Sequence, residues 1–165
     1  MPPTTRALTS ADRDDAVEVI NAAARWYRDF LPVDELHDPE MTPAQWTIES
    51  RRMTWHGAFV GGRLVGVVGL EYTKDVALMR HAYVRPDHQR FGIGSALLDA
   101  VEASVDGVRR IIAGTYRDNH KARGLLEKRG FQPSVDSESV LRTYYAIPED
   151  RLLSSVTYEK VIRTA

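Results

Sequence analysis

The sequence YVRPDHQRFGIGSALLDAVE, residues 83–102, passes from an extended run into a helical pattern through two closely spaced glycines, Gly92 and Gly94. Pro86 ends the extended run. After the glycines, apolar residues recur at helical spacing and give the helix one apolar face: Ile93, Leu97, Ala100, Val101 and Val105. The stretch therefore predicts a strand, a glycine-containing turn and a helix in succession.

Two common phosphate-binding motifs fail at this glycine pair. A P-loop requires Lys and then Ser or Thr after its last glycine, whereas Ser95 and Ala96 follow Gly94. A dinucleotide fingerprint requires Gly or Ala where Leu97 stands, and an acidic residue near Ile112, where there is none. Two interpretations remain at this point: a tight turn that uses glycine for its backbone freedom, or an anion site of another kind.

The surroundings of the glycine pair favour the anion site. Residues 89–95 enter the start of a helix, where free backbone N–H groups and the helix dipole attract negative charge. Glycine lacks Cβ, so a phosphate can approach the backbone closely. Arg85, His88 and Arg90 flank the turn with positive charge. The segment therefore predicts a cradle of backbone amides for a pyrophosphate.

Periodicity and turn residues predict an alternation of helices and strands along the chain. The predicted elements are a helix over 11–30, a helix over 42–53, a hairpin around Gly61 and Gly62, a strand over 76–84, the helix after Gly92, a strand over 108–116, a helix over 119–130, a strand at "FQP", a short helix in "SESVLRTYY" and a strand in "LLSSVTYEKV". With a strand expected at the start, the order is β-α-α-β-β-β-α-β-α-β-α-β. This order is typical of an α/β protein with a mixed sheet.

Bulk composition limits the function classes. The chain has 165 residues, a formal net charge of −1 and no cysteine. No basic field argues for nucleic acid, and disulfides and cysteine nucleophiles are excluded. The start shows no signal-peptide pattern, and the longest apolar run, "LVGVVGL", is too short to span a bilayer. We expect one domain over 1–165, a cytoplasmic location, and neither a membrane nor a nucleic-acid partner.

Two motifs together resemble the GNAT superfamily of N-acetyltransferases. "VRPDHQRFGIGSALL" resembles its acyl-CoA motif, V-x-P-x-x-Q/R-x-x-G-x-G/A-x-x-L-L. "NHKARGLLEKRGF" resembles the following motif, N-x-x-A-x-x-L-Y-x-K-x-G-F. The two stand in the expected order over about 83–131, with a strand between them. The resemblance implies the GNAT fold: a central, mostly antiparallel sheet with helices on both faces.

The resemblance also implies a site for acetyl-CoA as cosubstrate. The strands that end at Val84 and Thr115 should splay apart and leave a slot for the pantetheine arm. The backbone of Tyr83 and Val84 would bind that arm, Asn119 would reach the pantetheine or thiol region, and Ala122 would line it. The pyrophosphate would lie on the amides of the turn, which are those of Gln89, Arg90, Phe91, Gly92, Ile93, Gly94 and Ser95.

The implied activity is acetyl transfer to a primary amine of a small molecule or protein, by direct attack in a ternary complex. For the general base, Glu71 is the first choice, at the end of a strand where the slot opens, and His81 is the second, because imidazole suits proton transfer near neutral pH. Regular alternation would place His81 and Tyr83 on one face and Arg80, Ala82 and Val84 on the other, and a β-bulge would change that assignment.

One motif position departs from the family pattern. Leu126 stands where the family often has a tyrosine that acts as the general acid. Tyr116 is the predicted substitute, with Tyr144 and Tyr145 as further options. The departure leaves an alternative open, a GNAT-fold module that binds acyl-CoA without catalysis.

The acceptor is expected near the loop between the first two helices. Trp26, Tyr27 and Trp46 could line its site, and the acidic residues at 34, 35, 38 and 40 could attract a cationic amine. The five histidines show no metal-ligand spacing, so no metal is predicted. A homodimer that pairs the tail strand "SSVTYEK" of two copies stays open.

Overall fold

The central element of the fold is a mixed sheet whose strands follow the order β1-β2-β3-β4-β5-β7-β6. The computed structural model describes residues 2–26, 37, 39–89, 91–145, 147 and 149–162. Neighbouring strands are antiparallel except β4 and β5, which run parallel. The strands are β1 (Thr4–Ala7), β2 (Thr54–Val60), β3 (Arg63–Thr73), β4 (Val76–Val84), β5 (Arg110–Tyr116), β6 (Gln132–Pro133) and β7 (Ser155–Val161). The predicted α/β class and the mostly antiparallel sheet are therefore confirmed.

The first two helices begin where their capping residues stand and end earlier than predicted. A 3-10 turn (Ser10–Asp12) with a Thr9 capping box leads into α1 (Arg13–Ala24), so the α-helix ends before residue 30, and residues 27–30 lie outside the described ranges. A capping box of Thr42 and Gln45 starts α2 (Pro43–Glu49), which stops short of Met53. Turns with shorter hydrogen-bond spans follow both helices, and periodicity alone does not separate such turns from α-helix.

The remaining helices agree closely with the sequence pattern. They are α3 (Ile93–Ser104), α4 (His120–Lys128) and α5 (Ser137–Tyr144). Asn119 caps α4 through a hydrogen bond of 3.2 Å from the Ala122 N–H to its side-chain oxygen. In the described ranges, no helix is both long and apolar enough to cross a bilayer.

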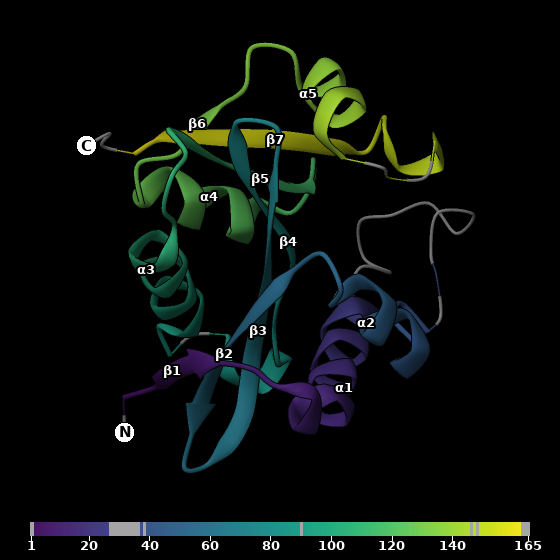
Figure 1. Cartoon of the computed structure of the whole chain (residues 1–165), viewed down its shortest axis with the longest axis vertical. Coiled ribbons are helices and arrows are strands. Elements are labelled where there is room, and N and C mark those ends of the chain that lie inside the picture. The colour runs from purple at the N-terminus through teal and green to yellow at the C-terminus, as the bar shows by residue number, and fades with distance from the viewer. Residues whose placement is uncertain are drawn as a thin grey trace.

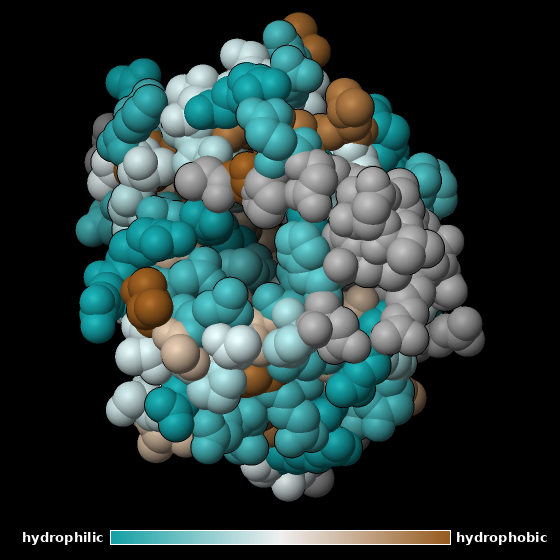
Figure 2. Space-filling model, turned by 90° about the vertical axis from the view of Figure 1, so that its right-hand side faces the viewer, coloured by the Kyte–Doolittle hydropathy of each residue, from teal (hydrophilic) through white to brown (hydrophobic). Residues whose placement is uncertain are grey.

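Helices cover both faces of the sheet (Figure 1). Helices α1 and α2 pack on one face, where Val19, Ile20 and Trp46 meet Trp55 and Val67. Helix α5 packs on the same face farther along the strands, with Leu141 and Tyr145 against Leu78 and Ile112. Helices α3 and α4 cover the opposite face, where Ile93, Leu97 and Leu126 meet strand residues such as Val68 and Met79. The surface over α1, α2 and α5 is mainly hydrophilic, with separate hydrophobic residues (Figure 2).

A β-bulge interrupts β4 in the middle of its pairing with β3. Tyr83 lies opposite Val67 and Arg80 opposite Gly69, so His81 and Ala82 together face Val68. His81 takes a left-handed backbone conformation with φ of 55°, which is uncommon for a residue other than glycine. Regular alternation is therefore wrong for Arg80, because the extra residue brings its side chain to the face that His81 and Tyr83 share.

The sheet forks at the parallel pair. Strands β4 and β5 pair only from Val76 to Met79 and from Arg110 to Ala113. Beyond these residues β4 stays paired with β3 as far as Val84, and β5 stays paired with β7 as far as Tyr116. The predicted splaying of the two strands is confirmed, and it opens a slot between them at their carboxyl ends.

Candidate active site

The fork holds a cavity of about 610 Å³. Its walls come from β4 and β5, from the starts of α3 and α4, and from residues near the end of α1 and after α5. Apolar side chains such as Met79, Leu97 and Leu126 form its floor on the α3–α4 face. A largely apolar slot between two splayed strands suits a flexible chain that carries polar groups at its ends.

The glycine turn forms one end of the cavity. Gly92 is the N-cap of α3 with φ of 75°, in the left-handed region that glycine adopts without strain. A Cβ built on Gly92 would meet no atom of the described residues within 4 Å, which leaves room for a ligand on that side. The first N–H groups of α3 have no carbonyl of their own helix to bond. The turn can therefore present backbone donors and a positive helix end to an anion.

Gly94 has a different structural role from Gly92. A Cβ on Gly94 would lie 2.6 Å from Cδ2 of Leu125 in α4. The missing side chain lets the first turn of α3 approach α4 closely. One glycine of the pair thus leaves room for a ligand, and the other sets the distance between the two helices that hold the turn.

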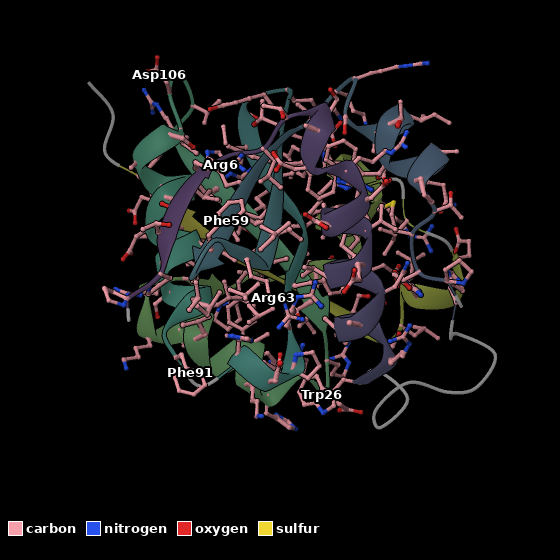
Figure 3. All side chains as sticks on the ribbon, turned by 90° about the horizontal axis from the view of Figure 1, so that it is seen from below. Arg6, Trp26, Phe59, Arg63, Phe91 and Asp106 are labelled. Carbon is pink, nitrogen blue, oxygen red and sulfur yellow. The ribbon has the colours of Figure 1, made fainter. Side chains whose placement is uncertain are left out.

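Most of the predicted cosubstrate residues line this cavity, and two of the described ones, Phe91 and Ile93, do not. The lining includes Tyr83, Val84, Gln89, Gly92, Gly94, Ser95, Asn119 and Ala122. The side chain of Ile93 is buried in the core, so only its backbone can take part. Phe91 is 67% exposed and projects from the same edge of the molecule as Trp26 (Figure 3). Arg90 lies outside the described residues.

Two of the flanking basic residues turn away from the slot. The Arg85 guanidinium donates to the Leu64 carbonyl over 3.0 Å and pairs with Glu18 of α1 over 3.0 Å. His88 lies 3.0 Å from Asp87. Neither residue lines the cavity. An anion bound at this turn would therefore meet backbone donors rather than these two side chains.

His81 lines the cavity at the bulge on β4. Its Nε2 lies 2.9 Å from Oε1 of Glu49, at the end of α2. Its ring stacks on Trp55 with 5.7 Å between centroids. Partial burial tends to raise the pKa of Glu49, yet the hydrogen bond with His81 and the charges of His81, Arg80 and Arg52 hold that pKa below its ordinary value. The pair therefore combines an imidazole with a carboxylate that is ionised at neutral pH.

Glu71 lies on the same face of the sheet but does not line the cavity. Its carboxylate accepts from Arg80 over 3.0 Å and pairs with Arg52 over 3.4 Å. Two guanidinium groups therefore occupy the carboxylate oxygens that a base would use. Its assignment as general base stays a prediction, and this geometry makes it a weaker candidate than His81.

The tyrosines near the fork occupy three different positions. Tyr116 is buried, lines the cavity and has the Arg151 guanidinium 5.6 Å from its ring centre. The buried Tyr145 hydroxyl lies 3.0 Å from the Met79 carbonyl and 3.2 Å from the Ile112 carbonyl, and burial raises its pKa. It thereby bridges β4 and β5 where their pairing ends. The Tyr144 hydroxyl accepts from Arg110 instead and does not line the cavity.

A buried ion pair closes the α1–α2 side of the cavity. Arg151 donates twice to Glu40, with both distances 2.9 Å, and the Tyr83 hydroxyl lies 3.4 Å from the same carboxylate. Trp26 lines the mouth, and the Lys121 ammonium lies 5.2 Å from its ring centre. Trp46 belongs to the core instead, stacked on Trp55. The other predicted acceptor residues, Tyr27, Asp34, Glu35 and Asp38, lie outside the described residues.

Sequence reasoning missed Glu49 and Arg151 because their partners are distant in the chain. Glu49 meets a residue 32 positions away, and Arg151 meets one 111 positions away. No local spacing signals either pair. Leu126 is buried against the cavity where the family often has tyrosine, so no hydroxyl stands there. Among the described residues, no group of three or more histidine or acidic side chains could hold a metal.

Comparisons with known proteins agree with this geometry. The sequence profile of the Acetyltransferase (GNAT) family matches residues 20–131. A PaiA N-acetyltransferase from Thermoplasma acidophilum, solved in complex with coenzyme A, superposes with a TM-score of 0.76 at 18% identity and covers 98% of this chain and 100% of its own. An acetyltransferase from Thermus thermophilus gives 0.70 at 23% identity, covering 98% of each chain. A GNAT-family acetyltransferase from Staphylococcus aureus gives 0.75 at 15% identity, covering 98% of this chain and 99% of its own. A search of curated proteins finds no match.

Proposed function

Because the chain belongs to the GNAT family of acetyltransferases, with acetyl-CoA as cosubstrate, we propose that it transfers an acetyl group to a primary amine by direct attack in a ternary complex. Residues 1–165 would act as one domain. The observation that carries the proposal is the forked cavity with the open Gly92 turn at one end and the His81 imidazole in its wall. The absence of cysteine from the chain supports direct transfer, since a cysteine acyl-enzyme is excluded.

The cosubstrate would use backbone groups along the slot. The pyrophosphate would accept from N–H groups of the turn over 89–95, where Gly92 leaves open space. The pantetheine arm would lie between β4 and β5, against Tyr83, Val84 and Ala122. The thioester would then stand near the fork, where backbone N–H groups of β4 can polarise its carbonyl oxygen.

His81 is the proposed general base. A primary amine with a pKa near that of lysine, about 10.4, is mostly protonated at neutral pH, so it must first lose one proton to solvent before the neutral amine can attack. As the amine nitrogen bonds to the thioester carbon, its proton passes to the imidazole, and the carbonyl oxygen becomes an oxyanion. The tetrahedral intermediate then collapses, the carbon–sulfur bond breaks, and the amide and the CoA thiolate are released.

The departing thiolate needs a proton. Tyr116 is the proposed donor, because it is a buried tyrosine that lines the cavity on β5. Tyr145 also lines the cavity, but its hydroxyl lies within bonding distance of two carbonyl oxygens and burial makes it a weaker acid. The tyrosine that the family often supplies from α4 is replaced by the buried Leu126.

The proposal is tested first by calorimetric titration with acetyl-CoA, and then in separate titrations with NAD and with ATP. Release of CoA thiol is then measured over a panel of amines. We expect binding of acetyl-CoA alone and turnover with at least one amine class. Failure to bind acetyl-CoA would refute the proposal. Binding without turnover on any amine would favour the alternative, a module that binds acyl-CoA without catalysis. The buried Leu126 supports that alternative, because it stands where the family often has a tyrosine.

The base is tested by His81→Asn beside Glu71→Gln. Asparagine tolerates the left-handed backbone at position 81, so the variant should fold. We expect kcat to fall about 100-fold with unchanged acetyl-CoA affinity, because general-base catalysis is typically worth that much or more. A fall of that size in Glu71→Gln, with His81→Asn close to wild type, would return the role to Glu71.

A further inference from the structure

Glu49 is a half-buried carboxylate that sequence motifs do not single out. It is the last residue of α2, and its Oε1 lies 2.9 Å from Nε2 of His81 on β4. Arg52 approaches the same oxygen over a longer distance of 3.4 Å. Among the described residues, the hydrogen bond from His81 is therefore the closest polar contact of this carboxylate, and it joins α2 to the wall of the cavity.

Aromatic rings hold the imidazole of His81 in a fixed plane. The ring stacks on Trp55 at an interplanar angle of 25°, and Trp55 stacks on Trp46 at 5.4 Å and 19°. The Trp55 indole N–H donates to Ser50 over 2.9 Å, and Ser50 in turn donates to the Trp46 carbonyl over 2.6 Å. Stacking fixes the plane of the imidazole, and the bond to Glu49 fixes its rotation within that plane.

The two ring nitrogens of His81 differ in their surroundings. An ionised carboxylate can only accept, so Nε2 must carry the hydrogen in the contact with Glu49. In a neutral imidazole the other nitrogen then has a free lone pair. Among the described residues Nδ1 has no hydrogen-bond partner, and His81 lines the cavity. The lone pair that could accept a proton is thus left for a molecule in the slot.

We propose that Glu49 is the positioning residue for His81: it holds the imidazole in the Nε2–H tautomer, so that Nδ1 takes the proton of the attacking amine. This inference rests on the proposed acetyl transfer. The amine proton moves to Nδ1 as the carbon–nitrogen bond forms, and the carboxylate of Glu49 stabilises the imidazolium through the Nε2–H bond. When the imidazolium returns its proton to solvent, His81 is neutral again in the same tautomer.

The test compares Glu49→Leu, which removes the acceptor at similar volume, with Glu49→Gln, which keeps an acceptor oxygen but not the charge. Glu159→Gln is the matched control, since Glu159 is also a partly buried carboxylate paired with an arginine, on β7 and outside the cavity lining. We expect kcat to fall at least tenfold in Glu49→Leu and less in Glu49→Gln, with acetyl-CoA affinity unchanged in both. Glu159→Gln should keep the wild-type kcat.

A second readout does not depend on activity. The ¹⁵N chemical shifts of the His81 imidazole, measured where the ring is neutral, should indicate the Nε2–H tautomer in the wild-type protein and a loss of that preference in Glu49→Leu. A wild-type ring in the Nδ1–H form, or a tautomer unchanged in Glu49→Leu, would overturn the proposal. So would a Glu49→Leu variant that binds acetyl-CoA normally and keeps the wild-type kcat.

The two readouts separate this inference from the proposed function. If the wild-type protein acetylates no amine, the proposed function fails, and the tautomer measurement still decides whether Glu49 orients the ring. If the protein is active but Glu49→Leu changes only its free energy of unfolding, Glu49 merely anchors α2 to the sheet, and the positioning role is refuted.

Discussion

The two walls of the slot are built in different ways. The wall formed by α3 and α4 offers backbone donors, glycines and apolar side chains, with Gly92 open to the cavity and Leu126 buried beside it. The wall on the side of α1 and α2 offers charged and aromatic side chains in pairs, such as His81 with Glu49 and Arg151 with Glu40. A cosubstrate that never changes can be bound by backbone geometry, whereas chemistry and acceptor choice require side chains that can be exchanged.

The largest effect is expected from Gly92→Asp, which changes the wall formed by α3 and α4. We expect acetyl-CoA to bind well over tenfold more weakly, because a side chain would enter the open space at the turn and its charge would repel the pyrophosphate. Calorimetric titration measures the change. Gly107→Asp is the matched control, since Gly107 also has a left-handed φ, of 79°, and open space around its Cβ position but does not line the cavity. Equal affinities in the two folded variants would remove the turn from the binding site.

Where the two walls meet, Tyr145→Phe tests the bridge across the fork. The single hydroxyl hydrogen is shared between the Met79 and Ile112 carbonyl oxygens in a buried site. Its loss should lower the free energy of unfolding by about 1–2 kcal/mol, and acetyl-CoA affinity should fall a few-fold as the slot widens. Chemical denaturation and calorimetry measure the two effects. Tyr144→Phe removes a hydroxyl bonded to Arg110 away from the cavity and should leave the affinity unchanged. An unaltered stability of Tyr145→Phe would mean that the bridge contributes nothing.

The smallest effect is expected at a charge pair remote from either wall. Arg6 donates to both carboxylate oxygens of Asp12, at 2.9 and 3.0 Å. These bonds, with a further one from the Thr9 N–H, lower the pKa of Asp12 to about 2. Because this pKa lies below that of an unfolded chain, about 3.9, the stabilisation is present above pH 4 and is lost as pH falls from about 4 to about 2.

Asp12→Asn should therefore cause a small loss of stability at neutral pH and flatten the pH dependence in that acid range. Denaturation at a series of pH values measures both, with Asp14→Asn, a more exposed carboxylate, as control. The pair lies outside the cavity lining, so turnover should not change. A wild-type pH profile in Asp12→Asn would contradict the assignment of the lowered pKa to this contact.

The same difference between the walls explains how much the sequence alone could predict. The turn at Gly92, the helix after it and the Gly61–Gly62 hairpin follow from local patterns in which a residue's neighbours along the chain determine its conformation. The fork was implied by the family resemblance instead, because it depends on where the pairing of two distant strands ends. The motif positions Asn119 and Ala122 likewise line the cavity.

The charged and aromatic pairs in the wall on the side of α1 and α2 could not be predicted in the same way. The bulge that turns Arg80 toward the face of His81 depends on pairing with β3, and no residue type marks it. The contact between His81 and Glu49 depends on where α2 packs against the sheet, which is a tertiary result. Helix ends were also misplaced at α1 and α2, because a 3-10 turn follows α1 and hydrogen-bonded turns follow α2, and sequence patterns do not separate such turns from α-helix.

The short parallel pairing at the fork has a consequence for the folding of the chain. Strands β1–β4 come from residues before 85 and strands β5–β7 from residues after 109, so each half of the sheet can form from its own antiparallel contacts. The halves are joined by four residue pairs between β4 and β5, together with contacts such as the Tyr145 bridge and the pair of Arg151 with Glu40. Because parallel pairing between distant segments forms slowly, we expect this join to form late in folding. A cosubstrate in the slot would contact both halves of the sheet and stabilise the join between them. At a concentration 100 times its Kd it would raise the free energy of unfolding by about 2.7 kcal/mol.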